Sequence, residues 1–272
     1  MSAQLLLGKP CVDAISQRIR QQVGDQTAKL CAIGFNEERW VQYANSLAKS
    51  ADKYGFQCEQ IVVDSDISPQ QFCSVIEKAC KQQGVYGVIV QQPLPTKYAE
   101  SLSCIDVNKD VDCLNPLSVA KLYQGVAGFR PATPSAVLAL LDYYGIDLQG
   151  KNVVIIGRGA SVGKPLALMM LARNATVTIC HTKTRDLAKI ARNADILVSA
   201  CGVAGLVTKE FVTSNSIVVD VGLSFVDGKT CGDVAKDVYD LCYAVSPVPG
   251  GVGPVTRAML FENLLTALNS TK

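Results

Sequence analysis

Residues 152–170 read NVVIIGRGASVGKPLALMM, and this stretch decides the fold of the second half of the chain. Asn152–Ile156 has the composition of a buried strand, and Lys164–Met170 that of a helix. The glycines between them let a backbone approach a pyrophosphate, and the N-terminus of the following helix offers free N–H groups. The spacing G-x-G-x-x-x-G is one residue longer than the commonest fingerprint. The stretch therefore predicts a strand, turn and helix that bind a dinucleotide.

Strand-like and helix-like segments also alternate in the first half. Short strand-like runs occur at 30–33, 60–63 and 87–90, and helix-period segments follow at 38–54, 69–82 and 98–104. This order predicts a parallel sheet with crossover helices. The alternation pauses over residues 108–134. There Thr133 and Pro134 are expected to be the N-cap and first-turn proline of a helix that ends at Tyr144. The predicted fold class is α/β with two domains.

The segment after the predicted strand 175–180 indicates which dinucleotide binds. An NAD site usually has an acidic residue about 20 residues beyond the glycines, but this chain has His181, Thr182, Lys183 and Arg185 there. Together with Arg158, these hydroxyl and cationic groups favour the 2′-phosphate of NADP. Lys183 and Arg185 fit a solvated helix start equally well, and His181 fits a structural role as well as a catalytic one.

Composition excludes several classes of protein. The chain has 272 residues and a net charge of +2, and 18% of its residues are charged, so a broad nucleic-acid-binding face is not expected. No apolar run approaches the roughly 18–20 residues of a membrane span. The N-terminal residues do not resemble a secretion signal, and we expect a cytoplasmic protein. The 11 cysteines are scattered and are expected to be reduced core residues; with one histidine, no metal site is expected.

A second glycine-rich loop lies near the C-terminus, at Pro247–Thr256. Its three glycines remove side chains along one face, so that a planar ligand can lie on the backbone. A rigid connector is the alternative, because glycine and proline are common in loops. Pro254 suits the first turn of the helix predicted through residues 257–269.

Seven segments occur together in one order: Val90–Pro95, Lys109–Asp112, Pro131–Pro134, Gly157–Pro165, Asp220–Gly222, Gly232–Val234 and Pro247–Thr256. In this combination the chain resembles the methylenetetrahydrofolate dehydrogenase/methenyltetrahydrofolate cyclohydrolase family, the bifunctional FolD type. The resemblance implies an N-terminal folate domain at 1–120, with the C-terminal helix 255–272 packing back on it. It also implies a Rossmann-like NADP domain at 121–254, a cleft between the domains, and a homodimer formed through the cofactor domains.

Site residues follow from the same resemblance. Tyr43, Gln91 and Asp112 match the family's catalytic positions, and Asp112 is the expected partner of the pterin ring. The implied substrate-binding residues are Tyr43, Leu47, Val90, Gln91, Gln92, Asp112, Pro249, Gly250, Gly251, Val252 and Gly253. The implied NADP-binding residues are Gly157, Arg158, Gly159, Ser161, Val162, Gly163, Thr182 and Leu223.

Three departures from the family pattern lie in the first domain. Leu47 stands four residues after Tyr43, where the family carries the lysine that acts as general acid/base near the tyrosine and Gln91. Lys49 points about 120° away from Tyr43 on a helix and is expected to be an exposed lysine. Phe35–Trp40 replaces the usual turn, and Cys113–Pro116 replaces a Gly-Phe-His-Pro segment.

The expected function is NADP-dependent oxidation of 5,10-methylenetetrahydrofolate to the methenyl form, in which catalysis is mainly the positioning of two rings. The cyclohydrolase step moves protons, and loss of its general acid/base costs about 10²–10⁴ in rate, so it is expected to be weak or absent. Two alternatives remain: a noncatalytic folate- or NADP-binding relative with a regulatory or scaffold role, and an unrelated dehydrogenase that shares only the architecture.

Overall fold

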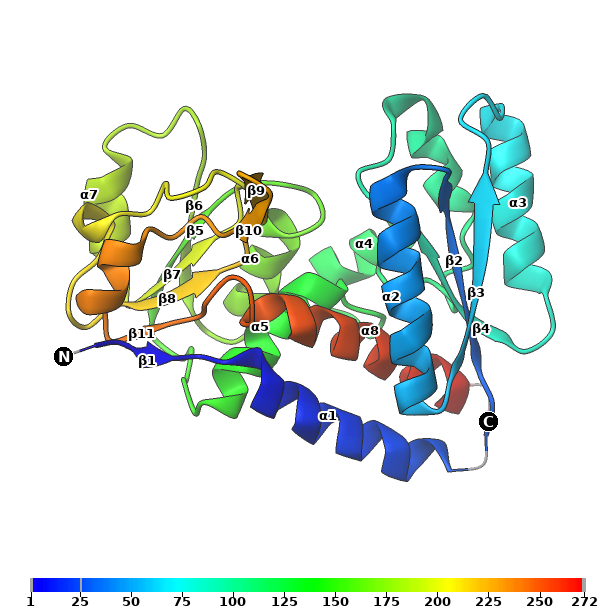
Figure 1. Cartoon of the computed structure of the whole chain (residues 1–272), viewed down its shortest axis with the longest axis horizontal. Helices are drawn as coiled ribbons and strands as arrows, with labels where there is room; N and C mark the ends of the chain where they lie inside the picture. Colours follow the sequence, from blue (N-terminus) through cyan, green and yellow to red (C-terminus); the bar gives the residue numbers. More distant parts are fainter. Residues whose placement is uncertain (1, 25, 271–272) are drawn as a thin grey trace. The chain divides into compact units, whose positions relative to one another are not determined.

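A computed structural model of the chain describes residues 2–24 and 26–270. The fold is α/β, as predicted, and it divides into two compact units that are each built from two segments (Figure 1). The first unit comprises the chain up to Asp13 together with Thr133–Thr256, and we call it the nucleotide unit. The second comprises Ala14–Ala132 and the chain from Arg257 onward, and we call it the folate unit. The boundaries fall within α1 (Gly8–Val23), α5 (Ala132–Tyr143) and α8 (Val252–Asn269).

The folate unit contains a three-stranded parallel sheet of order β3-β2-β4. Its strands are β2 (Lys29–Phe35), β3 (Gln57–Val63) and β4 (Val85–Val90), and its helices are α2 (Glu38–Tyr54), α3 (Pro69–Lys81), α4 (Pro116–Gln124) and the 3-10 helix η1 (Thr96–Cys104). The rings of Phe35 and Phe72 stack in its core, and the ring of Tyr98 packs against both at a tilt. The alternation of segments thus predicted the order of these elements.

Local signals explain where the helices of the folate unit begin and end. Ser68 and Gln71 form a reciprocal capping box at the start of α3, and Pro69 occupies the first turn. Helix α2 ends at Gly55, whose φ of 82° suits glycine. The predicted helix at 98–104 is a 3-10 helix rather than an α-helix.

The nucleotide unit contains a six-stranded parallel sheet of order β1-β11-β8-β7-β5-β6. Its strands are β1 (Gln4–Leu5), β5 (Asn152–Ile156), β6 (Thr176–Cys180), β7 (Ile196–Ser199), β8 (Ile217–Asp220) and β11 (Ala244–Val245). Helices α6 (Gly163–Leu171) and α7 (Leu187–Arg192), the 3-10 helices η2 (Lys209–Phe211) and η3 (Lys236–Asp240), and the hairpin β9 (Ser224–Val226) to β10 (Lys229–Cys231) complete it. The parallel sheet with a glycine turn between β5 and α6 is the arrangement that residues 152–170 predicted.

The observed units differ from the predicted domains 1–120 and 121–254. The chain's first residues lie in the nucleotide unit because β1 pairs with β11. Residues 121–132 lie in the folate unit, where the Asn263 side chain donates hydrogen bonds to the carbonyls of Val111 and Arg130. Residue 1 and the last two residues of the predicted helix 255–272 lie outside the described residues.

Two predicted helix starts are wrong. Helix α5 begins at Ala132, so that Thr133 is a helical residue and not the N-cap. The Asp112 carboxylate accepts the N–H of Ala132 at 3.1 Å and thereby satisfies a donor of the first turn. Helix α8 begins at Val252, five residues before the predicted helical segment, so Val252 and Gly253 belong to its first turn rather than to the loop.

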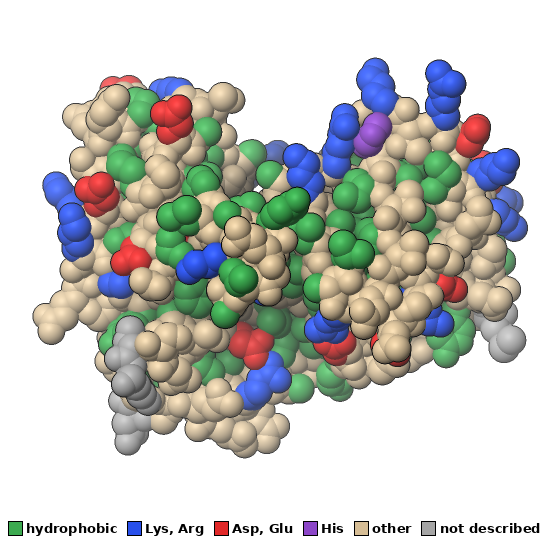
Figure 2. All heavy atoms as spheres, turned by 180° about the vertical axis from the view of Figure 1, so that it is seen from behind, with side chains coloured by type: hydrophobic (Ala, Val, Ile, Leu, Met, Phe, Trp, Pro, Cys, Tyr) green, Lys and Arg blue, Asp and Glu red, His purple; other side chains and the backbone are tan. Residues whose placement is uncertain are grey.

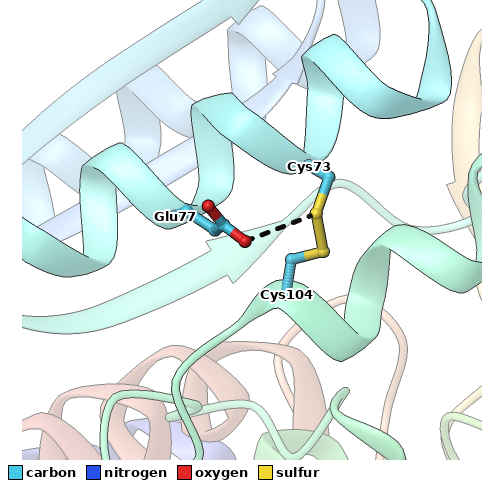
Figure 3. A group of neighbouring side chains, drawn as sticks. All are labelled: Cys73, Glu77 and Cys104. Carbon is cyan, nitrogen blue, oxygen red and sulfur yellow. Dashed lines mark hydrogen bonds between the residues drawn. A yellow bond between two sulfur atoms is a disulfide. The ribbon is translucent and has the colours of Figure 1, made fainter.

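Two cysteines are paired, contrary to the expectation that all are reduced. Cys73 on α3 and Cys104 at the end of η1 form a disulfide, and Glu77 lies one turn further along α3 (Figure 3). The ligand atoms of these three residues lie within 4.8 Å of one another, as in a metal site. A metal ligand must be a free thiolate, however, and in this state neither sulfur is one. The other nine cysteines are free, and six of them are buried: Cys11, Cys31, Cys80, Cys113, Cys180 and Cys242.

No helix in the described ranges is long and apolar enough to cross a membrane.

Candidate active site

Gln91 directly follows β4, and its side-chain amide is held by the folate unit itself. Its backbone N–H donates to the carbonyl of Ile33 at 2.8 Å, which places the residue at the end of the sheet. Only 5% of the residue is exposed. The amide oxygen accepts the N–H of Phe35 at 2.8 Å, and the amide nitrogen donates to the Glu37 carboxylate at 2.8 Å. Val90 beside it is buried, whereas Gln92 is exposed.

Tyr43 and Leu47 lie one turn apart on α2, as the sequence predicted. Tyr43 is 38% exposed, and its ring centroid lies 5.6 Å from that of Trp40. Desolvation by the surrounding protein, and next the negative charge of Asp112, raise the pKa of the Tyr43 hydroxyl above its usual range. Leu47 is fully buried and Lys49 is exposed, so α2 brings no amine to the position one turn after Tyr43.

Asp112 lies in the turn that leads to α4, close enough to Tyr43 for the two side chains to interact electrostatically. Burial raises the pKa of the Asp112 carboxyl to about 6, and this effect outweighs the hydrogen bond from the N–H of Ala132. Nearby Asp110 has a different role. It is completely buried and accepts the N–H groups of Leu114 and Asn115, so it shapes the turn. Asp112 is therefore the carboxylate in this turn that retains a free oxygen for a ligand.

The predicted NADP-binding residues gather at the carboxyl ends of neighbouring parallel strands in the nucleotide unit. Ile156 of β5 pairs in register with Cys180 of β6, so the turns that follow these strands lie side by side. A side-chain carbon on Gly163 would lie 2.1 Å from the Gly157 carbonyl oxygen, and therefore only glycine lets α6 approach the strand so closely. Gly159 has open space around it. Ligands of open parallel sheets bind at this edge.

Cationic side chains border this edge. Arg158, Thr182, Lys183 and Arg185 are all exposed. Figure 2 shows the only histidine of the chain, His181, among several Lys and Arg side chains. The Nδ1 atom of His181 accepts the N–H of Lys183 at 3.1 Å, which gives the ring a role in shaping the turn. Ser161 is exposed and Val162 half-buried just before α6.

Two buried carboxylates hold the loops that follow β7 and β8. Asp233 accepts the Ser199 hydroxyl at 2.8 Å and the N–H of Val203 at 2.7 Å, while Asp220 accepts the N–H groups of Gly222 and Asp233 at 3.0 Å. Burial raises the pKa of the Asp220 carboxyl to about 6. This network holds the segment that presents Leu223, which is 61% exposed, toward solvent at the same edge of the sheet.

The C-terminal glycine loop lies against this network. A side-chain carbon on Gly232 would lie 2.0 Å from Asp220 and 2.8 Å from the Val248 side chain. Gly250 has a φ of 108°, and the N–H of Gly251 closes a turn onto the Pro247 carbonyl at 2.7 Å. Gly253, in the first turn of α8, has open space around it. Pro249–Gly253 thus adjoins the strand ends at which the predicted cofactor residues lie.

Comparison with known protein families finds a match to each half of the chain. A sequence model of the tetrahydrofolate dehydrogenase/cyclohydrolase NAD(P)-binding domain matches residues 131–272, and one of the catalytic domain of the same family matches residues 6–112. The chain belongs to this family. The match sets aside an unrelated dehydrogenase that shares only the architecture.

Relatives in the tetrahydrofolate dehydrogenase/cyclohydrolase family cover the whole chain. The bifunctional protein FolD 1 of Desulfitobacterium hafniense is 40% identical over 98% of this chain and 99% of its own length. The crystal structure of the bifunctional FolD enzyme of Campylobacter jejuni has a TM-score of 0.95 at 34% identity, with full coverage of both chains. The Trypanosoma brucei FolD structure, complexed with NADP cofactor and an inhibitor, has a TM-score of 0.92 at 32% identity over 100% of this chain and 99% of that one.

Sequence reasoning missed two residues that contact or influence the predicted site. Glu37 was noted only as part of an altered turn, yet it binds the Gln91 amide across 54 positions of the sequence. The positive charge of Arg257 on α8 opposes the rise in the pKa of Tyr43. The position of Arg257 just after the glycine loop was the one signal for it.

Proposed function

We propose that the protein oxidises 5,10-methylenetetrahydrofolate to 5,10-methenyltetrahydrofolate in one-carbon metabolism, with NADP as the hydride acceptor. The observation that carries this proposal is the family match over both units, which includes Gln91, Asp112 and the glycine turns. The named relatives are bifunctional dehydrogenase/cyclohydrolases, and one of them was solved with NADP.

The nucleotide unit fits a dinucleotide phosphate. The close approach of Gly163 to Gly157 and the open space at Gly159 leave the turn before α6 accessible to a pyrophosphate. Arg158 and Thr182 would hold the 2′-phosphate, since a guanidinium donates charge-assisted hydrogen bonds to phosphate oxygens. The bound cofactor supplies the acceptor carbon for the hydride. The residues of the chain bind and orient it.

The folate unit supplies recognition of the pterin. One oxygen of the Asp112 carboxylate accepts the N–H of Ala132 at the start of α5, and the other is free. Together the two oxygens can accept two parallel hydrogen bonds from an aminopyrimidine edge. At the end of β4, the side-chain amide of Gln91 presents the hydrogen-bonding groups that Phe35 and Glu37 leave free. Tyr43 offers a hydroxyl from α2. The nitrogens of the substrate stabilise the cation that hydride transfer leaves, so the residues need only hold the ring in place.

We propose that the cyclohydrolase step is weak or absent. Ring opening of the methenyl cation needs a group that moves protons, and the buried Leu47 side chain cannot do so.

The test is an absorbance assay for methenyltetrahydrofolate with purified protein, 5,10-methylenetetrahydrofolate, and either NADP or NAD. Formation of the methenyl product that requires NADP, followed by slow conversion to 10-formyltetrahydrofolate, is the expected result. Binding of folate and NADP in calorimetry without any product would instead support the noncatalytic relative, for which the missing lysine is the motivating observation.

The proposal includes a homodimer formed through the nucleotide unit and a cytoplasmic location. Support for the dimer comes from apolar side chains at one edge of this unit: Leu171 at the end of α6 is 60% exposed, and Ile179 on the outermost strand β6 is 39% exposed. Light scattering of the wild-type protein and of a Leu171→Glu/Ile179→Glu variant tests the dimer. The mass of a monomer for both proteins would rule it out. Cell fractionation tests the location.

A further inference from the structure

The turn between β2 and α2, residues 35–40, replaces the turn that the family resemblance leads us to expect, and it contacts the Gln91 amide directly. The N–H of Phe35 can only donate, so the atom of the amide that faces it at 2.8 Å must be the oxygen. The Glu37 carboxylate accepts, so the atom that faces it at 2.8 Å is the nitrogen. Chemistry therefore fixes one of the two possible flips of this amide.

The fixed flip determines what Gln91 offers a ligand. One N–H of the amide nitrogen and one lone pair of the amide oxygen remain free. Since Gln91 is 95% buried, the side chain has little room to find other partners. Without Glu37, the amide would keep only the bond from Phe35 at its oxygen, and its nitrogen would lose its fixed position.

Among the residues that the structure describes, the Glu37 carboxylate has no hydrogen-bond or ion-pair partner that competes with Gln91. It lines a hollow of about 490 Å³ together with Asp64, Ser65 and Asp66, so the other charged side chains that line this hollow are also acidic. No salt bridge among residues 2–24 and 26–270 includes Glu37. Its one side-chain hydrogen bond there is the one to Gln91.

The same turn also contacts the other predicted catalytic residue. Trp40 is 6% exposed, and its ring lies against that of Tyr43. Gly34 makes room for the indole, because a side-chain carbon at Gly34 would lie 2.3 Å from the indole nitrogen. The turn thus fixes Gln91 through Glu37 and supports Tyr43 through Trp40.

We propose that Glu37 is a positioning residue that orients Gln91 toward the folate ring and takes the place of the missing amine as its polar partner. The family resemblance places a lysine near Tyr43 and Gln91, whereas Leu47 has no polar atom to hold the amide. This inference rests on the proposed dehydrogenase function.

Steady-state kinetics of Glu37→Ala and Glu37→Gln test the proposal. Glu37→Ala lowers kcat for methylenetetrahydrofolate oxidation by about tenfold to a hundredfold, as expected when a positioned group is released. Glu37→Gln retains an acceptor for the Gln91 nitrogen and stays within about threefold of the wild type. The KM for NADP does not change. Glu38→Ala is the matched control, because it removes a neighbouring carboxylate from the same helix start, where Glu38 accepts a hydrogen bond from the Gln42 side chain.

A double-mutant cycle separates positioning from a purely structural role. In a Gln91→Ala background, Glu37→Ala lowers kcat by less than about twofold if Glu37 acts through Gln91. If the losses of kcat in Glu37→Ala and Gln91→Ala multiply in the double variant, the two residues act independently and the proposal is overturned. Wild-type kinetics for Glu37→Ala would also overturn it. If Glu37→Ala does not fold, Glu37→Met keeps the volume of the stem without the acceptor, and the same losses are expected.

A readout without turnover distinguishes this inference from the proposed function. The side-chain amide resonances of Gln91 in NMR spectra shift between wild type and Glu37→Ala but not between wild type and Glu38→Ala. An unchanged Gln91 signal in Glu37→Ala would refute the positioning role. A wild-type protein that makes no methenyl product would refute the dehydrogenase function, and the NMR result would still decide whether Glu37 orients the amide.

Discussion

At the scale of single residues, the chain retains the groups that we propose to hold two rings and lacks the amine that the family resemblance leads us to expect. Leu47 fills its position completely, with none of its surface exposed. An aliphatic side chain there contributes packing to the folate unit and nothing to acid/base chemistry. The proposed loss of the cyclohydrolase step rests on this one side chain.

Replacing Leu47 with lysine is expected to raise cyclohydrolase activity. The buried amine would have a lowered pKa and would lie one turn from Tyr43, where it can exchange protons. The variant is also expected to lose about 1–3 kcal/mol of stability, since a polar group enters the core. The rate of 10-formyltetrahydrofolate formation measures the gain, with Leu47→Met as the volume-matched control. An equal rate in both variants would show that more than the amine is missing.

The pH dependence of folate binding is expected to follow Asp112. Its pKa rises from 3.8 to about 6 in the folded protein, and the ionised form is the one that accepts two hydrogen bonds. Below about pH 6, kcat/KM for the folate should fall about tenfold per pH unit. The free energy of unfolding depends on pH in the opposite direction. A raised carboxyl pKa stabilises the fold at low pH, and this contribution is lost as pH rises from about 4 to about 6. Initial rates at saturating NADP test the first part, and Asp112→Asn should abolish the inflection.

At the scale of elements, periodicity predicted most helices and strands because apolar spacing reports directly on burial. The range 38–54 predicted for one helix is that of α2. The start of α5 was misplaced because a distant side chain, Asp112, caps it, and this contact cannot be read from the residues around Thr133. The bond between Glu37 and Gln91 and the pairing of Cys73 with Cys104 escaped prediction for the same reason: both join positions far apart in the sequence.

Removing the disulfide is expected to destabilise the folate unit only under oxidising conditions. Cys73 and Cys104 are 31 residues apart, and closing a loop of this length in the unfolded chain is worth about 3–4 kcal/mol. Urea unfolding of wild type and Cys104→Ser should differ by this order without a thiol reductant and converge with one. Cys58→Ser, at a free cysteine on β3, is the control. A difference that persists in reductant would mean that the thiol contributes through packing instead.

At the scale of the whole molecule, the two units carry different groups of predicted site residues. The nucleotide unit carries its cations beside the strand ends of β5 and β6, and the folate unit carries Gln91, Tyr43 and Asp112. The predicted site residues are therefore divided between two separately built units, and the sequence analysis also divided them between two domains.

NADP is expected to stabilise the protein more than NAD at equal concentration. At about a hundred times its Kd, a ligand that binds only the folded state adds about 2.7 kcal/mol. Arg158→Ala should reduce the thermal shift with NADP and leave the shift with NAD unchanged, since the role we propose for the guanidinium is to bind the 2′-phosphate, which NAD lacks. Lys189→Ala, on α7, serves as a charge-matched control. Equal losses with both cofactors would place Arg158 at the pyrophosphate instead.

The pairing of β1 with β11 has a consequence for biosynthesis. Gln4–Leu5 are translated before the other strands of their sheet, yet their neighbours Ala244–Val245 are translated after all the others. The folate unit likewise waits for the segment from Arg257 onward. Nascent chains halted at mid-length would thus hold neither unit in finished form, and no single cleavage of the gene could give two self-sufficient halves.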